Sequence, residues 1–311
     1  MLTDIEDGKK DVNTFHLAGI IPIAGQKLDF KFPWHDSLMP VADNLTAVEN
    51  AVLQCTYAGC ESIWIVAHRE MQPILRDRIG DWIFEYGSLL QSRFKERMAS
   101  EQVRETSIYY VPIHPKDRDK RDCLAWSVIY GSLRAFHISK TISSWVVPDK
   151  YFVSFPYGIV PLDSIYKSRS LISSPKNFYM QHDGKTIRDG EYLPFTFDKE
   201  DFKKFRRVIR SEGTGVFTDF QIDKVTKNIT ETRLPANQQY SARSFTLDKV
   251  FGCATLEGNN VGQAAWYSRI DSWKNYQEFM RSENSRLVYR PSFFKYHEWS
   301  PIAVDKDDLE E

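Results

Sequence analysis

The first half of the chain alternates between short apolar runs and segments with helical spacing, and this alternation constrains the fold more than any other feature. The apolar runs at residues 15–25, 62–68 and 107–115 each have the length and composition of a buried strand. Strand–helix alternation of this kind is typical of a mostly parallel sheet with helices on both faces. We therefore expect a three-layer, Rossmann-like α/β domain with a mixed, mostly parallel central sheet.

Local signals predict where the first helix begins and ends. Thr46 can cap a helix whose apolar residues follow a helical period, and Gly59 is suited to end it. The same reasoning predicts further helices over 71–100, with Pro73 in the first turn, and over 123–139. A fourth strand is expected over 143–154, with a break at Pro148-Asp149.

The sequence pattern changes at about residue 156, where the regular strand–helix alternation ends. Asp-Gly and alternating aromatic residues predict a hairpin within 184–197, and further strands are expected over 215–235. Charged amphipathic helices are expected over 198–213 and over 271–283, the latter capped by Asp271 or Ser272. We divide the chain into a polar leader (1–14), an α/β domain (15–285) with a variable, β-rich insertion at about 156–260, and a C-terminal extension with an acidic tail (286–311).

Composition and charge exclude several classes of protein. The 311 residues include 42% hydrophobic and 14% aromatic residues, so the chain can bury a large core. The 41 basic residues almost balance the 42 acidic ones, which gives no long-range attraction to nucleic acid or to an anionic membrane. No apolar run approaches the ~20 residues that cross a bilayer. The charged N-terminus lacks the apolar region of a signal peptide, so we expect a cytoplasmic protein.

Cysteine spacing argues against a disulfide framework or a zinc site. None of the four cysteines forms a Cys-x-x-Cys pair, and Cys55 and Cys60 both lie in apolar surroundings. Three tryptophans near the expected site, Trp34, Trp126 and Trp145, are interpreted as core residues rather than stacking platforms.

Four stretches together resemble the sugar-phosphate nucleotidyltransferases, also called nucleotide-sugar pyrophosphorylases. "AGIIPIAG" resembles the family's first strand and the start of its nucleotide loop, and "SLMPVADNLTAVENAVLQCTYAGCESIWIV" the segments that follow. "CLAWSVIYGSLRAFHISKTISSWVVPDKYF" resembles the helix and strand that deliver a metal-binding Asp, and "AWYSRIDSWKNYQEFMRS" the closing strand and helix. The likeness covers roughly 17–154 and 264–282. It implies the nucleotide-diphospho-sugar transferase fold.

The resemblance implies a phosphate-binding loop after the first strand, and this chain departs from the family's pattern there. The family's loop carries an Arg and then a Pro-Lys pair, whereas here His35 and Asp36 stand about where Pro-Lys would be. The remaining fixed cations are Lys27 and Lys31, which we assign with His35 as candidate catalytic residues. The nucleotide-binding candidates are residues of this loop and of the segment before the helix at Cys123: Ala24, Gly25, Gln26, Arg121 and Asp122.

The resemblance also implies a Mg²⁺ ion held by two aspartates, which would neutralise phosphate charge and orient the attack. Asp149 is aligned with the first of them. Arg269 stands near the second, with Asp271 two residues further on the same face of a strand. Either Asp271 substitutes as the ligand, or Arg269 replaces the metal with its own fixed charge.

Three functions are therefore open. The first is transfer of a nucleoside monophosphate from a nucleoside triphosphate to a phosphorylated sugar, with release of pyrophosphate. The second is glycosyl transfer from a nucleotide sugar, although "PDK" supplies only one of the two carboxylates such enzymes use. The third is a non-catalytic protein that keeps the fold for nucleotide binding or for assembly with a second copy or another protein. The resemblance makes the first function our leading expectation, with Mg²⁺ as its cofactor, whereas the altered loop and Arg269 favour the third.

Overall fold

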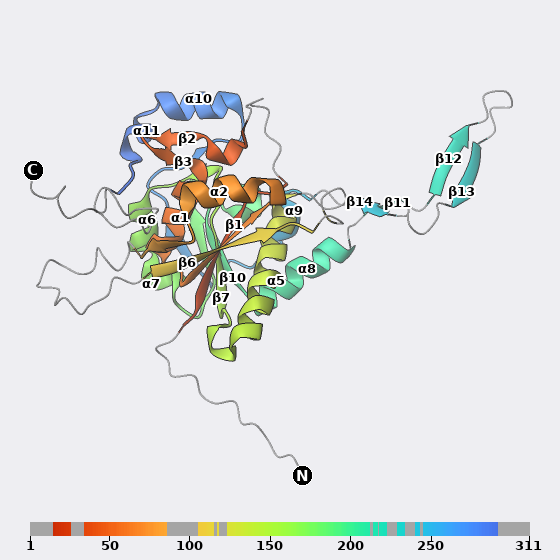
Figure 1. The fold of residues 1–311 in the computed structure, drawn as a ribbon, viewed down its shortest axis with the longest axis horizontal. Coiled ribbons are helices and arrows are strands. Elements are labelled where there is room, and N and C mark those ends of the chain that lie inside the picture. Colours follow the sequence, from red (N-terminus) through yellow and green to blue (C-terminus); the bar gives the residue numbers. More distant parts are fainter. Residues whose placement is uncertain are drawn as a thin grey trace, which may run out of the picture.

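We analysed a computed structural model, which describes residues 15–25, 34–85, 105–114, 117, 123–211, 214–216, 218–222, 229–233, 240–242 and 245–291. An eight-stranded sheet in the order β15-β9-β10-β7-β1-β4-β6-β5 forms its centre (Figure 1). Its strands are β1 (Leu17–Pro22), β4 (Ser62–Ala67), β5 (Trp82–Phe84), β6 (Glu105–Pro112), β7 (Lys150–Val153), β9 (Phe178–Gln181), β10 (Phe195–Asp198) and β15 (Asn260–Gln263).

The sheet is mixed, as expected from the sequence. Strands β7, β1, β4 and β6 run parallel to one another, and β15 runs parallel to β9. Strand β10 pairs antiparallel with both β7 and β9, and β5 pairs antiparallel with β6. The four central parallel strands therefore end at one common edge of the sheet, which we call the carboxyl edge. The opposite side, where they begin, is the amino edge.

Helices cover both faces of the sheet and complete the three layers. Helices α1 (Ala47–Ala58) and α2 (Gln72–Ile79) pack on one face, and α5 (Leu124–Ile142) packs on the other. Glycines permit this close packing, because a Cβ on Gly19 would meet Cys55 of α1 and one on Gly131 would meet Val66 of β4. The other helices of the described residues are α6 (Leu162–Lys167), α7 (Arg169–Ile172), α8 (Lys199–Ser211), α9 (Leu247–Phe251), α10 (Trp273–Arg281) and α11 (Glu283–Leu287).

Among the described residues, four two-stranded ladders lie outside the central sheet. Two-stranded ladders join β2 (Pro40–Ala42) to β3 (Leu45–Thr46) and β8 (Gly158–Ile159) to β16 (Ser268–Arg269). The β-rich insertion contains β11 (Thr214–Val216) paired with β14 (Tyr240–Ala242), and β12 (Thr218–Ile222) paired with β13 (Ile229–Arg233). These two ladders project from the body of the molecule (Figure 1). None of the described helices is both long and apolar enough to cross a membrane.

The predicted start and end of α1 are confirmed. Thr46 and Glu49 form a capping box, in which each side chain bonds the other's backbone amide, and Gly59 ends the helix in a left-handed conformation. The carboxylate of Glu49 is buried and also contacts Arg78 at 2.9 Å and Arg290 at 3.8 Å. The N-terminus of α1 is thus connected to a residue more than two hundred positions further along the chain.

Three sequence expectations were wrong in part. The helix predicted over 71–100 ends at Gly80, which has a φ of 89°, and the next residues form β5. The strand predicted over 143–154 is a 3-10 turn over Ser144–Val146, and only β7 is extended. Asp189-Gly190 ends another 3-10 turn rather than forming a hairpin loop. In each case a local turn intervenes where the apolar pattern continues. The leader 1–14 and residues 292–311 lie outside the described residues.

Candidate functional site

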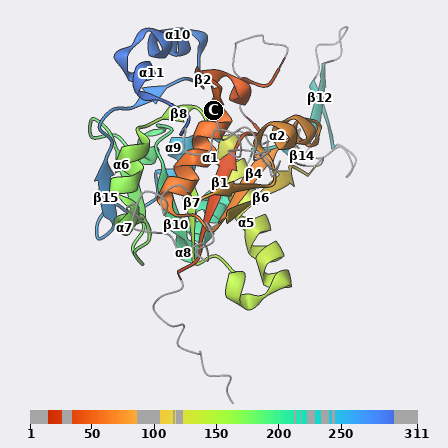
Figure 2. The same ribbon diagram turned by 60° about the vertical axis from the view of Figure 1, so that its left-hand side comes forward.

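The carboxyl edge of the sheet is where open α/β proteins hold their ligands. The chain turns there immediately after β1, and α10, α11 and β2 lie beside this end of the molecule (Figure 2). Gly25 has a φ of 88°, and a Cβ on it would lie within 2.6 Å of backbone atoms of Cys123 at the start of α5. The Oγ of Ser127 donates to the carbonyl of Ala24 at 2.7 Å. The structure thus brings Ala24 and Gly25 against the beginning of α5, and only glycine fits at position 25.

The other loop candidates lie outside the described residues. These are Gln26, Lys27 and Lys31 after Gly25, and Arg121 and Asp122 before α5. Their roles stay predictions.

His35 is a neutral capping residue in this structure. Its Nδ1 accepts from the amide of Ser37 at 3.2 Å, at the start of a 3-10 turn over Asp36–Leu38. Burial, and secondarily the charge of His68, lowers the pKa of His35 to about 4. His35 therefore carries no positive charge at neutral pH, and the next residue, Asp36, is acidic. A triphosphate gains no cation from this pair.

The two predicted metal ligands lie at opposite edges of the sheet. Asp149 precedes β7 rather than following it, and its Oδ2 accepts from the amide of His16 at 3.0 Å, just before β1 begins. Asp271 lies at the carboxyl edge, because the neighbouring amide of Ile270 donates to the carbonyl of Tyr157 beyond the end of β7. The structure therefore does not bring Asp149 and Asp271 together as a shared metal ion would require.

Asp271 is instead held by Arg269. The Nε of Arg269 lies 2.5 Å from one oxygen of Asp271, and Asn275 donates to the other oxygen at 3.0 Å. A second carboxylate, that of Glu191, lies 3.5 Å from Arg269 and 3.6 Å from Lys185. The guanidinium also lies over the ring of Tyr192, 4.8 Å from its centre. We call Lys185, Glu191, Arg269 and Asp271 the paired cluster, since two basic and two acidic side chains balance within it.

The donor set does not fit the implied Mg²⁺ ion. Mg²⁺ is held through carboxylate oxygens, and both oxygens of Asp271 already accept hydrogen bonds, one from the guanidinium of Arg269 and one from the amide of Asn275. Within the described ranges, no group of three or more His, Cys, Asp or Glu side chains could hold a metal ion.

A cavity of about 500 Å³ opens beside the paired cluster. Tyr267 links its wall to the core: its hydroxyl accepts from the amide of Tyr192 at 3.0 Å and donates to Glu191 at 3.2 Å. No local sequence pattern indicates a role for Tyr267. The polar residues that line the cavity are His182, Asp183, Lys185, Glu191, Tyr267, Ser268, Arg269, Asn275, Glu278 and Ser282.

Tyr157 is a second residue at this edge that sequence reasoning missed. Its side chain is fully buried near Asp36 and Tyr192, and burial raises the pKa of its hydroxyl well above the ordinary value. The hydroxyl has no hydrogen-bond partner among the described residues. A buried apolar run gives no indication that one of its members will carry an unpaired donor.

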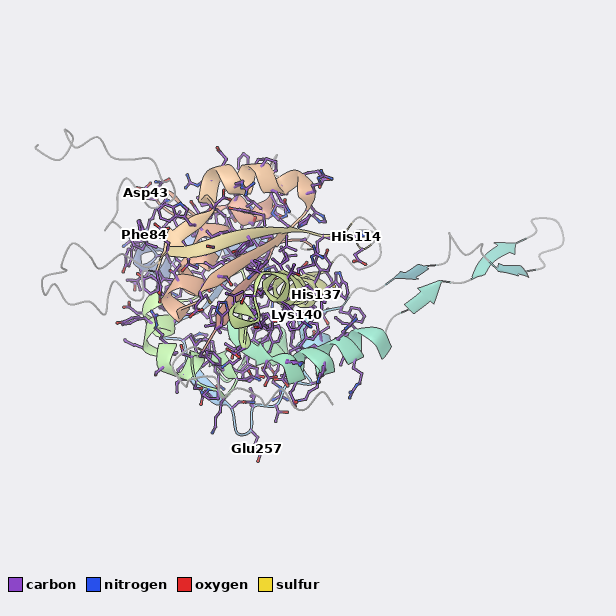
Figure 3. All side chains as sticks on the ribbon, turned by 60° about the horizontal axis from the view of Figure 1, so that its bottom comes forward. Asp43, Phe84, His114, His137, Lys140 and Glu257 are labelled. Carbon is purple, nitrogen blue, oxygen red and sulfur yellow. The ribbon has the colours of Figure 1, made fainter. Side chains whose placement is uncertain are left out.

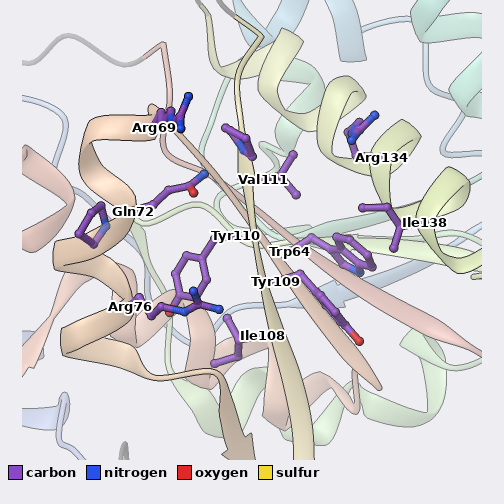
Figure 4. Close-up of a pocket in the computed structure, with 12 residues that line it drawn as sticks. Trp64, Arg69, Gln72, Arg76, Ile108, Tyr109, Tyr110, Val111, Arg134 and Ile138 are labelled. Carbon is purple, nitrogen blue, oxygen red and sulfur yellow. The ribbon is translucent and has the colours of Figure 1, made fainter. Parts of the chain in front are cut away.

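A separate cavity of about 630 Å³ flanks β6 (Figure 4). Arg69, Gln72 and Arg76 reach it from the α2 side, and Arg134 reaches it from α5. Tyr109 stacks on the buried Trp64 with ring centres 4.3 Å apart. This cavity shares no lining residue with the one beside the paired cluster.

The strand order, the layers and the early glycine turn define the class of fold: the chain has the fold of the sugar-phosphate nucleotidyltransferases, as the resemblance predicted. A Bacillus anthracis protein assigned as a glucose-1-phosphate thymidylyltransferase aligns over 88% of this chain and 97% of its own, with a TM-score of 0.51 and 9% identity. A UDP-glucose pyrophosphorylase aligns over 88% and 99%, with a TM-score of 0.48 and 9% identity. No protein-family model and no curated protein sequence matches the chain.

Proposed function

We propose that this protein binds a phosphorylated or nucleotide-linked sugar in the cavity beside the paired cluster, without metal-assisted nucleotidyl transfer. The pairing of Asp271 with Arg269 carries the proposal, because it removes the carboxylate that the metal would need. This is the non-catalytic function that the altered loop already favoured.

The lining of the cavity suits a sugar. Glu191, Glu278 and Asn275 offer acceptors and donors to hydroxyl groups, and Tyr267 contributes an aromatic ring. Lys185 and Arg269 can each bind a phosphate in exchange for their present contacts with Glu191 and Asp271. Two cations match the negative charge of a ligand with one or two phosphates better than that of a triphosphate.

Titration calorimetry would test the proposal, with glucose 1-phosphate and UDP-glucose as probes and with and without Mg²⁺. We expect binding that is independent of Mg²⁺ and about tenfold weaker in Lys185→Gln or Glu191→Gln. Lys249→Gln, an exposed substitution on α9, is the matched control and should bind like the parent. Absence of binding by either probe at millimolar concentration would contradict the proposal.

A second candidate is nucleotidyl transfer itself, with Mg²⁺, a nucleoside triphosphate and a sugar phosphate. The close packing of Gly25 on the start of α5 favours it, because the nucleotide loop keeps its tight first turn. Pyrophosphate release from a triphosphate and glucose 1-phosphate, dependent on Mg²⁺ and lost in Lys27→Ala, would establish this candidate and overturn the first. Transfer of the sugar from UDP-glucose to water or an acceptor would instead indicate a glycosyltransferase.

A further inference from the structure

A cavity of about 600 Å³ lies at the amino edge of the sheet, away from the paired cluster. Helix α5 contacts α8 there, and the segment that leads into β7 closes the third side. Figure 3 shows His137 and Lys140 on α5, next to α8. The apolar side chains that line the cavity are Leu133, Phe136, Val147, Pro148, Tyr151 and Phe202.

The rim of this cavity is basic. Lys199, Lys203 and Arg206 are spaced by four and three residues, so they follow one face of α8, and all three line the cavity. They are exposed and form no ion pair within the described ranges. By contrast, Lys204 on the same helix pairs with Asp201 at 2.7 Å. Three cations of α8 therefore face the cavity without an ion pair to any described residue.

The other charged groups around the cavity do not cancel the positive charge of these three side chains. His137 lines it from α5, and the ammonium of Lys140 lies 5.9 Å from the centre of the Phe136 ring. The single carboxylate in the lining is that of Asp149, which accepts from the amide of His16. An apolar wall with convergent cations at its mouth is the arrangement of a small-molecule site.

We infer that this cavity binds an amphipathic anion, with an apolar chain or ring against Phe136 and Tyr151 and an anionic head at Lys203 and Arg206. Burial of the apolar part provides the driving force, and the three cations of α8 select the sign of the head. The two sites are independent, because the cavity lies at the opposite edge of the sheet from the proposed sugar site.

Titration calorimetry with monomeric decanoate, decanol and decyltrimethylammonium would test the inference, since the three probes share a chain and differ in charge. We expect decanoate to bind at least tenfold more tightly than either of the others. Affinity should also rise from hexanoate to decanoate, by at most about fourfold per added carbon.

Two neighbouring positions on α8 give a matched pair of variants. Arg206→Glu should weaken decanoate binding at least tenfold, whereas Arg207→Glu makes the same change of charge at an exposed residue that does not line the cavity. Equal losses in the two variants would overturn the inference, because net charge would then explain the binding. Equal affinity for decanol and decanoate would also overturn it.

Two further results would show that something other than a free amphipathic anion occupies the cavity. Binding to vesicles of anionic lipid without binding of monomeric decanoate would identify a membrane surface instead. The leader joins the described chain beside Asp149 and contains Asp4, Glu6 and Asp7. A tenfold gain in decanoate affinity when these three are changed to Asn, Gln and Asn would identify the leader as the occupant. Either result would overturn the inference.

Discussion

The two edges of the central sheet differ in whether the charged side chains beside their cavities form ion pairs. At the carboxyl edge, Arg269 and Lys185 lie within ion-pair distance of Glu191 or Asp271. At the amino edge, three cations of α8 face an apolar cavity without an ion pair in the described part of the chain. In folds of this type, ligands usually bind at the carboxyl edge. Here a basic rim without described ion pairs lies at the other edge.

This difference shows that a fold does not determine which charged groups are available to a ligand at a given edge of its sheet. The carboxyl edge keeps the tight turn at Gly25, but the charges of the paired cluster already contact one another, so a ligand that binds them must exchange existing contacts for new ones. The amino edge requires no such exchange. Fold alone would direct every experiment to the first edge.

The largest effect is expected at the carboxyl edge. Gly25→Ala should lower the free energy of unfolding by about 4 kcal/mol, because the new Cβ combines a strained φ with overlap against Cys123. Gly258→Ala is the control, since Gly258 also has a positive φ, 79°, but no atom near its missing Cβ. That variant should lose only about 1 kcal/mol. Urea unfolding measures both, and similar losses would show that the close approach is unimportant.

The amino edge contains a buried cation of a different kind. The Nζ of Lys150, only 1% exposed, donates to the carbonyls of Ile172, Ser174 and Lys176 at 3.0, 2.9 and 2.6 Å. Lys150→Met leaves these three acceptors without their donor, which should cost about 3 kcal/mol in urea unfolding. The exposed substitution Lys199→Met should cost less than about 0.5 kcal/mol. A loss below 1 kcal/mol in Lys150→Met would mean that water replaces the ammonium.

Acid should weaken the carboxyl edge through His35. Its pKa is about 4 in the folded protein and 6.5 in the unfolded chain, so the unfolded chain binds more protons between these values. Stability is therefore lost as pH falls through this window, by about 2 kcal/mol from pH 7 to pH 5. His35→Gln should remove that part of the pH dependence, whereas the exposed His137→Gln should retain it. Unfolding at several pH values distinguishes the two.

The smallest expected effect concerns Arg269. Its side chain is 39% exposed, so solvent screens its ion pairs and Arg269→Gln should cost only about 1 kcal/mol. The same change leaves Asp271 and Glu191 without their shared guanidinium, and calorimetry should then detect Mg²⁺ binding that the parent lacks. Arg281→Gln on α10 is the control. Equal Mg²⁺ binding by parent and variant would contradict the assignment of a paired cluster.

Sequence patterns predicted the elements whose signals are local. The capping box at Thr46 and the glycine that ends α1 are specified by neighbouring residues, and so are the cores of β1, β4 and β6. Asp149 was misplaced because Pro148-Asp149 is a turn signal that fits either end of a strand, and only pairing with β1 decides which. The paired cluster joins Lys185 and Glu191 to Arg269, about eighty residues away, and no local pattern specifies such a contact.

The contacts of Glu49 have a consequence for the order in which the chain acquires its structure. During synthesis, α1 leaves the ribosome with its capping box and soon afterwards with Arg78, whose side chain also bonds Asn44. Arg290, which donates to the carbonyl of Asn44 at 2.9 Å, emerges only after more than two hundred further residues have been made. The first helix of the domain is therefore completed by one of its last described residues, so a chain that stops short of position 290 lacks the contact that closes the domain on itself.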